Sequence, residues 1–208
     1  MKSLLIVGAG GHGGVVADAA HASGAWQEIA FLDDTPDAGP VHGQWPVLGP
    51  AALAASLRPR FPAALVAIGN AQTRLLRLDE LAGLGYELPV VRHPLSAVGV
   101  NVRLGPGTVI LAGAVINSGT RVGRGCIVNS SASVDHDCLL GEGVHVCPGA
   151  HVAGDVQVGS RSWLGIGCSV RQGIRIGEGA TIGAGAAVVR DVPDLATVVG
   201  VPAKELKR

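Results

Sequence analysis

The sequence predicts a Rossmann-like α/β domain followed by a parallel β-helix. Three observations lead to this fold class. Apolar strand-like segments alternate with helical segments over residues 1–94, and every sixth residue from position 98 onward is aliphatic. The chain also has 32 glycines but only three Trp, two Phe and one Tyr. Such a composition suits narrow coils joined by tight turns, which have little room for aromatic rings.

The overall composition indicates a folded protein with no strong electrostatic preference for a partner. Apolar residues make up 48% of the 208 residues, and mean hydropathy is +0.40, so aliphatic side chains suffice for a core. Sixteen basic and sixteen acidic residues give a net charge of zero, which argues against nucleic acid or an anionic membrane as partner. No apolar run approaches the ~20 residues of a membrane span, so we expect a soluble, cytoplasmic protein.

The first part of the chain reads as a small parallel α/β domain that ends at His93-Pro94, because the residue before proline favours an extended backbone. Strands and helices that alternate along the chain are typical of parallel sheets. The expected strands are residues 3–7, 29–32, 64–68 and 88–91, and the expected helices are residues 15–22, 51–57 and 73–82.

The second part contains an unbroken repeat of six residues. The aliphatic positions are Val98, Leu104, Ile110, Ile116, Val122, Val128, Val134, Leu140, Val146, Val152, Val158, Leu164, Val170, Ile176, Ile182 and Val188. A period of six fits neither a helix nor a hairpin, but it fits short strands stacked as a solenoid. This hexapeptide pattern predicts a left-handed parallel β-helix of about five coils, with 18 residues per coil and residues 18 apart stacked on each other.

The four cysteines are expected to remain reduced. Cys126, Cys138 and Cys168 occupy positions four residues after an aliphatic one, where most residues are small, and the predicted coil puts them at three different corners. They should therefore not pair, and no C-x-x-C motif suggests a zinc site. Cys147 falls at a different position of the repeat, and we expect it to be exposed.

A glycine loop follows the first strand and opens the first helix. Gly8, Gly10 and Gly13 fit G-x-G-x-x-G, and the second strand ends in Asp33 and Asp34 about twenty residues later. Bare glycines let main-chain N–H groups approach a diphosphate at a helix N-terminus. The domain is too short for a dehydrogenase, but it could hold a nucleotide diphosphate, with the two carboxylates accepting hydrogen bonds from the ribose or base.

Several motifs occur in an order that resembles a known family. They are G-A-G-G-H-G at 8–13, F-L-D-D at 31–34, A-I-G-N at 67–70, H-P at 93–94, V-D-H-D-C at 134–138 and G-V-P-A-K at 200–204. The chain thus resembles the sugar O-acyltransferases of the sialic acid O-acetyltransferase type, and among them the bacterial N-acetyltransferases of nucleotide-linked (UDP-4-amino-sugar) amino sugars.

The resemblance implies an activity and a division of labour. Acetyl-CoA would acetylate the amine of a nucleotide-linked 4-amino-4,6-dideoxy sugar, for surface glycan biosynthesis, without a metal. Residues 1–94 would bind the nucleotide sugar, and residues 95–208 would form the acetyltransferase domain with a short C-terminal tail. The enzyme would be a homotrimer with active sites between β-helices.

The resemblance also implies the catalytic residues. Acetyl transfer to an amine needs a base, a donor for the oxyanion and positioning of both substrates. His136 would be the base and Asp137 its carboxylate, although side chains alternate along a strand, so Asp135 is an equal local candidate. Asn117 lies one predicted coil before Asp135 and could hold it. Gly154 lies one predicted coil after His136, where its main-chain N–H could serve the oxyanion.

The substrate contacts follow in the same way. For the nucleotide sugar they would be Gly10, Gly11, His12, Asp33, Asp34 and Gly69, and for acetyl-CoA they would be His145, Gly154, Ile166 and Ala184. His145 lies half a coil from His136, so the two should meet only between neighbouring subunits. His151 is interpreted as structural. Lys204 and Lys207 are further candidates for the CoA phosphates.

Three other functions remain open from the sequence. The same base could serve O-acetylation of a sugar or sialic acid. A zinc carbonic anhydrase uses the same coils, but it needs three convergent histidines, and His136, His145 and His151 fall at different positions of the coil. In a scaffold without catalysis, the repeat would only trimerise a nucleotide-sensing domain.

Overall fold

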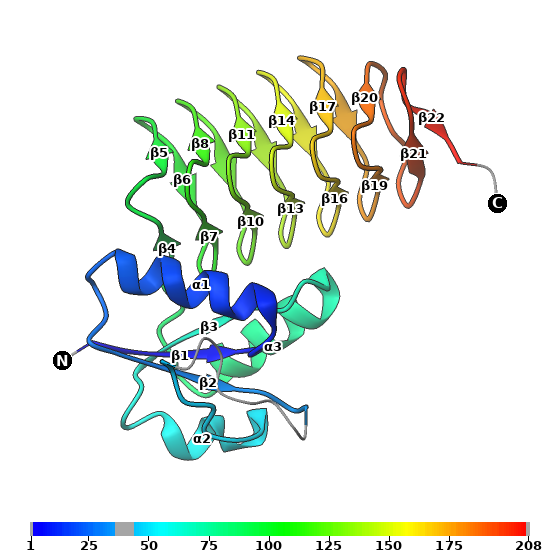
Figure 1. The fold of residues 1–208 in the computed structure, drawn as a ribbon. Coiled ribbons are helices and arrows are strands. Elements are labelled where there is room, and N and C mark those ends of the chain that lie inside the picture. Colours follow the sequence, from blue (N-terminus) through cyan, green and yellow to red (C-terminus); the bar gives the residue numbers. More distant parts are fainter. Residues whose placement is uncertain (1, 36–43, 207–208) are drawn as a thin grey trace. The chain divides into compact units, whose positions relative to one another are not determined.

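The structure is a computed structural model, and it describes residues 2–35 and 44–206. The chain divides into two compact units, Met1–Pro94 and Leu95–Arg208 (Figure 1). The predicted fold class, an α/β domain followed by a hexapeptide-repeat β-helix, is confirmed. The substrates that each unit binds stay predictions at this point.

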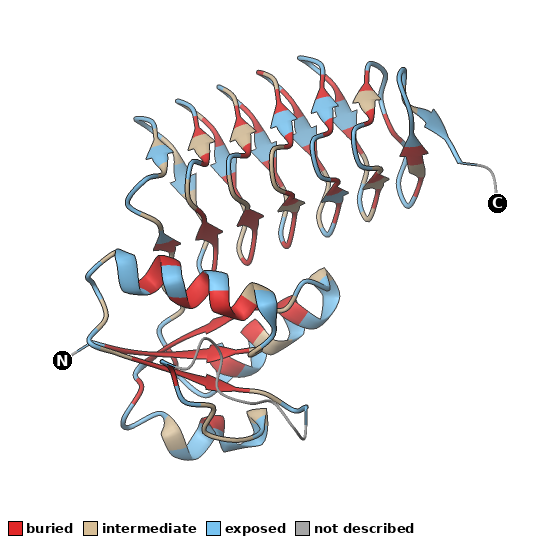
Figure 2. Cartoon of the chain, viewed as in Figure 1, coloured by how far each residue is buried: buried red, intermediate tan, exposed pale blue. Residues whose placement is uncertain are grey.

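The first unit is built on a parallel three-stranded sheet with the order β2-β1-β3. Its elements are β1 (Ser3–Val7), α1 (Gly11–Ala22), β2 (Glu28–Leu32), the 3-10 helix η1 (Ala51–Leu53), α2 (Ala54–Leu57), β3 (Ala63–Val66), α3 (Ala71–Gly83) and β4 (Val91–Arg92). β1 and β3 are buried along their whole length, and α1 buries one face (Figure 2). The sheet therefore forms the middle of the unit, and the loops at the C-terminal ends of its strands are free to carry a site.

Most predicted elements of the first unit agree with the structure to within two residues, and two predictions differ by more. α1 begins at Gly11 instead of residue 15, because the glycine loop itself forms the first helical turn, with Gly14 N–H donating to Gly10 O at 3.1 Å. The predicted strand at 88–91 is wrong. Only Glu87 forms a bridge to the sheet, and Pro89 follows it, which lacks the N–H that a strand needs.

The second unit is a parallel β-helix whose short strands make three faces (Figure 1). The β11 face holds β5 (Ala97–Val98), β8 (Val115–Ile116), β11 (Ser133–Val134), β14 (His151–Val152), β17 (Ser169–Val170) and β20 (Ala187–Val188). The β12 face holds β6 (Arg103–Leu104), β9 (Arg121–Val122), β12 (Leu139–Leu140), β15 (Gln157–Val158) and β18 (Arg175–Ile176). The β13 face holds β7 (Val109–Ile110), β10 (Ile127–Val128), β13 (His145–Val146), β16 (Trp163–Leu164), β19 (Thr181–Ile182), β21 (Thr197–Val199) and β22 (Lys204–Glu205).

The register of the coils follows the repeat predicted from the sequence. His145, for example, pairs with Ile127 on one side and Trp163 on the other. The aliphatic position of each repeat points inward and is buried from Ile110 to Val188, while Val98 and Leu104 in the first coil are partly covered. The β-helix is therefore stabilised by aliphatic side chains that are buried in one continuous column.

The β-helix has about six turns instead of the predicted five. The segment after Val188, expected as a short tail, forms another coil that adds Val192 and Val198 to the core. This coil is shorter than the others, because Thr181 pairs with Thr197, whereas a full repeat would bring it to Val199. β22 then pairs antiparallel with β21. The change of spacing explains why a strict period of six did not reveal it.

The four cysteines are buried free thiols. Cys126, Cys138 and Cys168 lie in the interior, as predicted. The prediction that Cys147 is exposed is wrong, since only 2% of it is accessible. Cys147 lies near Cys168 of the next coil. Burial, and to a smaller extent the neighbouring Cys168, raise the pKa of the Cys147 thiol to about 12. In the described residues, no helix has the length and apolarity of a membrane span.

Thiol accessibility tests this packing. Because all four thiols are buried, and burial raises the pKa of Cys138, Cys147 and Cys168, we expect none to react with a disulfide thiol reagent at pH 7.5 in the folded protein. All four should react in guanidinium chloride. One fast thiol per folded chain that disappears in Cys147→Ser would contradict the burial of Cys147.

Candidate active site

The D-H-D triplet forms a corner between β11 and β12. The His136 corner is defined here as the turns that join the β11 face to the β12 face, at residues 99–102, 117–120, 135–138, 153–156, 171–174 and 189–191. His136 is exposed there, and its Nδ1 lies 2.9 Å from Asp137 Oδ2. The sequence left open which carboxylate meets the imidazole, and the structure gives this contact to Asp137.

The backbone explains why adjacent side chains can touch. Asp137 has a φ of +57°, so the chain turns there and the alternation of a strand does not apply. The Asp135 carboxylate is engaged elsewhere, because its Oδ1 accepts from Asn117 Nδ2 at 2.7 Å and from His136 N–H at 2.8 Å. The predicted contact between Asn117 and Asp135 is thus present.

The charges around His136 favour its protonated form. The hydrogen bond to Asp137 is the main reason that the pKa of His136 is raised above its usual value, and the charges of Asp135, Asp137 and Asp155 act in the same direction. The bonds from Asn117 and from the main chain lower the pKa of Asp135. With Nδ1–H directed at Asp137, the lone pair of Nε2 is available as a base.

Glycines on the neighbouring coils make room for both side chains. A Cβ on Gly154 would lie 2.5 Å from His136 Nε2, and a Cβ on Gly119 would collide with Asp137 Oδ1. Each glycine lies one coil away from the side chain that it accommodates, and Asp155 N–H donates to His136 O at 3.0 Å to hold the coils together. No described residue accepts a hydrogen bond from Gly154 N–H, which lies beside the imidazole. Gly119 was missed from the sequence, although the same coil arithmetic would have found it.

Of the residues predicted to contact acetyl-CoA, Gly154 lies against His136, and the other three lie elsewhere on the β-helix. His145 is on the β13 face, with Nε2 3.1 Å from Asn129 Nδ2, so the chain does not bring it to His136. Ile166 is 57% exposed, and Ala184 follows it one coil later, with Gly185 N–H donating to Ile166 O at 2.8 Å.

The remaining basic candidates of the β-helix can also be placed. His151 Nδ1 lies 2.8 Å from Ser133 Oγ, which agrees with a structural role. Lys204 is exposed on β22, whereas Lys207 lies outside the described residues.

The glycine loop contains two kinds of glycine. Gly8 has a φ of +106°, and a Cβ on Gly13 would collide with Gly8 O, so these two are required by the turn itself. By contrast, a Cβ on Gly10, Gly11 or Gly69 would meet nothing within 4 Å. The second group therefore leaves open space above the first turn of α1, where main-chain N–H groups point outward.

An arginine that the sequence did not reveal lies under this loop. Arg74 of α3 is only 1% exposed, and it donates to Ile68 O at 2.7 Å and to Gly69 O at 2.8 Å. Burial, and then the charge of Arg74, lower the pKa of His12 to about 4, so His12 is neutral at physiological pH. The signal in the sequence was a basic residue on the buried face of α3, four and seven positions before Leu78 and Leu81.

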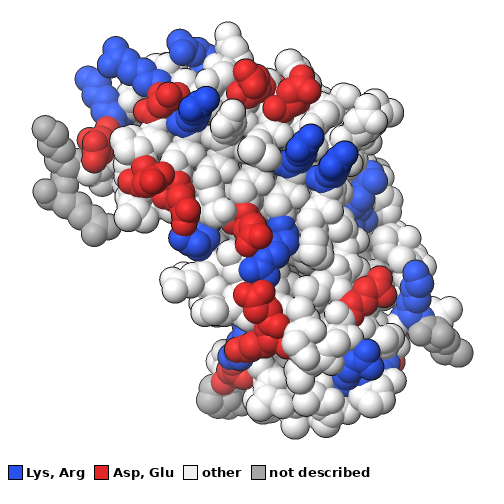
Figure 3. Space-filling model, turned by 180° about the vertical axis from the view of Figure 1, so that it is seen from behind, with Lys and Arg blue, Asp and Glu red and all other residues white. Residues whose placement is uncertain are grey.

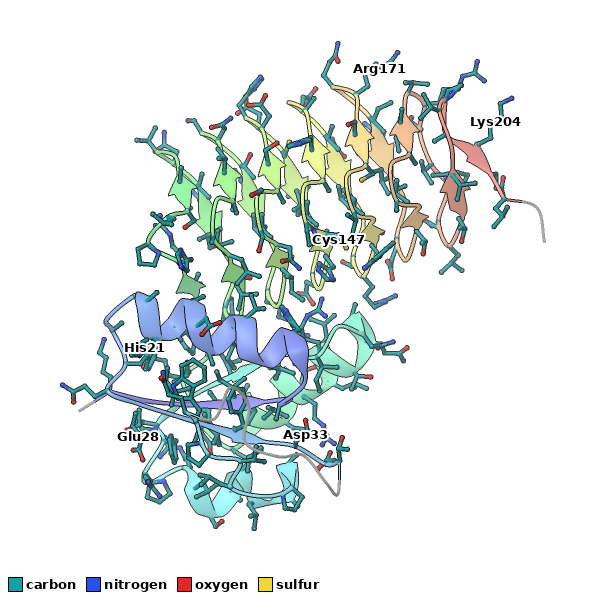
Figure 4. All side chains as sticks on the ribbon, in the orientation of Figure 1. His21, Glu28, Asp33, Cys147, Arg171 and Lys204 are labelled. Carbon is teal, nitrogen blue, oxygen red and sulfur yellow. The ribbon has the colours of Figure 1, made fainter. Side chains whose placement is uncertain are left out.

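The two predicted ribose ligands are both engaged within the chain. Asp33 Oδ2 accepts from Ala9 N–H at 2.6 Å, and its Oδ1 accepts from Thr35 N–H at 2.7 Å (Figure 4). Asp34 accepts from the N–H of Ala51 at 2.8 Å and from Arg77 at the same distance. Asp33 thus fixes the glycine loop to the end of β2. Among the described residues no group of three or more His, Cys, Asp or Glu could hold a metal ion.

The His136–Asp137 contact can be tested by NMR titration. In Asp137→Asn the main cause of the raised pKa is removed, so we expect the pKa of His136 to fall toward its usual value, about 6.5. Asp135→Asn is the matched control and should lower it less, because only the charge of Asp135 acts on the imidazole. An unchanged pKa in Asp137→Asn would show that the two side chains are not paired in solution.

Comparison with known proteins agrees with this geometry. The PglD N-terminal domain family matches residues 3–81, and the bacterial transferase hexapeptide family (six repeats) matches residues 155–190. A curated UDP-N-acetylbacillosamine N-acetyltransferase of Bacillus subtilis (strain 168) is 37% identical over 115 residues, which are 54% of this chain and 52% of the relative. The match thus spans about half of that relative's length.

Solved structures match over the whole chain. The acetyltransferase domain of PglB from Neisseria gonorrhoeae FA1090 is 45% identical with a TM-score of 0.95, covering 99% of this chain and 100% of that one. PerB from Caulobacter crescentus, solved in complex with CoA and GDP-perosamine, is 38% identical with a TM-score of 0.94, covering 100% and 98%. The predicted resemblance is confirmed, and the chain belongs to the family of sugar N-acetyltransferases that join a PglD-type N-terminal domain to a hexapeptide-repeat β-helix.

Proposed function

We propose that this protein transfers the acetyl group of acetyl-CoA to the amino group of a nucleotide-linked 4-amino-4,6-dideoxy sugar, in surface glycan biosynthesis. The observation that carries the proposal is the His136 imidazole, bonded through Nδ1 to Asp137 and packed through Nε2 over Gly154. Acetyl transfer needs a base and an oxyanion donor side by side, and this corner supplies both.

The proposed reaction gives each group of the corner a defined role. The amine nitrogen attacks the thioester carbonyl carbon while His136 Nε2 takes up the amine proton, and Gly154 N–H donates to the oxyanion. The tetrahedral intermediate then collapses, the C–S bond breaks, and the proton on His136 passes to the CoA thiolate. Asp137 stabilises the imidazolium between the two proton transfers, which is the role its effect on the pKa of His136 suits.

Nucleotide-sugar binding is proposed for the glycine loop of the first unit. The open space over Gly10, Gly11 and Gly69 suits a diphosphate held by main-chain N–H groups at the start of α1. His12 is neutral there and can act as a hydrogen-bond donor, while Arg74 adds a fixed positive charge below the loop. Asp33 and Asp34 retain free lone pairs, since each carboxylate can accept about four hydrogen bonds.

A homotrimer would complete the acetyl-CoA site. His145, Ile166 and Ala184 lie on other parts of the β-helix than His136, so in this proposal they reach the reacting thioester from a neighbouring copy. N-acetylation is favoured over O-acetylation because the relatives named above carry the name of N-acetyltransferases or were solved with an amino-sugar nucleotide.

The decisive experiment measures CoA thiol release with a panel of UDP-, dTDP- and GDP-linked amino sugars and their hydroxyl counterparts. We expect turnover with one amino sugar, and a loss of about 10²–10⁴-fold in His136→Ala, the contribution of a positioned base. His151→Ala is the matched control and should keep full activity, because the His151 side chain bonds to Ser133 and not to the His136 corner.

The pH dependence of kcat/KM tests whether His136 acts as a base. The base must be neutral, so kcat/KM should rise with pH through the raised pKa of His136, and this rise should move to lower pH in Asp137→Asn. Wild-type protein that turns over no amino sugar, or turnover that persists in His136→Ala, would refute the proposed function. Preference for the hydroxyl sugars would favour O-acetylation.

A further inference from the structure

The His136 corner has an uneven distribution of charge along the β-helix. Two columns of residues spaced 18 apart in sequence run along this corner; the coils stack in full register as far as Val188, and the last coil, which holds Val189 and Arg190, is shorter. One column is Gly99, Asn117, Asp135, Ala153, Arg171 and Val189, and the other is Val100, Ser118, His136, Gly154, Gln172 and Arg190. Cations therefore occur only on the C-terminal side of His136, beyond the small residues Ala153 and Gly154.

Neither arginine is neutralised by a residue that the structure describes. Arg171 and Arg190 are exposed, and no described residue forms an ion pair or side-chain hydrogen bond with either guanidinium. Asp191 is adjacent to Arg190 in sequence, but its Oδ1 accepts from Arg175 N–H at 2.8 Å. Figure 4 shows Arg171 projecting from the edge of the β-helix near β17.

Arginines at another corner behave differently. Between the β12 and β13 faces, Arg124 bonds to Glu142 of the next coil at 2.9 Å, and Arg161 pairs with Glu178. Acidic and basic side chains are accordingly mixed over the face of the molecule seen in Figure 3. The corner that carries the catalytic base thus keeps two arginines free for an external anion.

We propose that Arg171 and Arg190 bind the phosphate groups of acetyl-CoA. This inference rests on the proposed function, because it takes the thioester to lie at His136 and Gly154. The pantetheine arm separates the thioester from the phosphates, so the anionic end must lie several coils away. Coils stack at about 4.8 Å, which puts Arg171 and Arg190 roughly 10 and 14 Å further along the helix axis.

The small residues between base and arginines fit the same ligand. Ala153 and Gly154 have at most a methyl side chain, so they leave room for the pantetheine arm to pass along the corner. Gln172, one coil after Gly154, carries a side-chain amide. On the N-terminal side of His136, the columns contain only Asn117, Ser118 and smaller or apolar residues, and the exposed Arg121 lies outside the columns, on the β12 face. Arginine suits phosphate through paired N–H donors and a permanent charge.

Calorimetric titration of the full-length protein with CoA, 3′-dephospho-CoA and pantetheine tests the proposal without needing the sugar. We expect Arg171→Gln and Arg190→Gln each to weaken CoA binding by about tenfold, equivalent to ~1.4 kcal/mol. Pantetheine, which has no phosphate, should bind both variants as it binds wild type. Arg103→Gln is the matched control, since Arg103 is an exposed arginine on the β12 face, and it should bind CoA normally.

The outcomes separate this inference from the proposed function. CoA binding unchanged in both variants, or weakened equally for pantetheine, would overturn the assignment of the arginines while leaving acetyl transfer intact. Wild-type protein that does not bind CoA at all would overturn both. If one variant binds CoA more weakly than wild type but binds 3′-dephospho-CoA equally well, the proposal is supported and that arginine is the ligand of the 3′-phosphate.

Discussion

The register of the β-helix is the constraint on which the candidate site depends. Main-chain bonds such as Asp155 N–H to His136 O fix each coil on the next, so a residue meets its counterpart one coil along. This places Gly119 against Asp137 and Gly154 against His136. A side chain at either glycine would occupy the space of the His136 imidazole or of the Asp137 carboxylate, so these glycines make room for the candidate site as well as for the turns.

The same register organises electrostatics along the corner. Carboxylates surround the imidazole and raise its pKa, whereas arginines occur only two and three coils later. In the first unit the positive charge comes from a buried residue. Arg74 lies under a glycine loop that Asp33 fixes in place. In the proposed function, the anionic groups of both substrates would meet positive potential, while the His136 imidazole stays close to negative charge.

Most of the architecture could be predicted from the sequence because it depends on periodicity. An aliphatic residue every sixth position defines the coils, and arithmetic alone predicted the contact of Asn117 with Asp135. Features that depend on local backbone or packing could not be obtained that way. The positive φ of Asp137 brings it to His136, the coil after Val188 changes its length, and Cys147 is covered by the next coil. No periodic pattern reports these properties.

Turnover of Gly154→Ala tests most directly whether coil stacking builds the active site. The added Cβ would lie 2.5 Å from His136 Nε2, so the imidazole must move and the main-chain donor is covered. We predict a fall in kcat of about 10²–10³-fold, the range for loss of an oxyanion donor, with folding unchanged. Gly83→Ala at the end of α3, where a Cβ meets nothing within 4 Å and φ is not positive, should remain active. A Gly154→Ala enzyme with wild-type kcat would contradict the account.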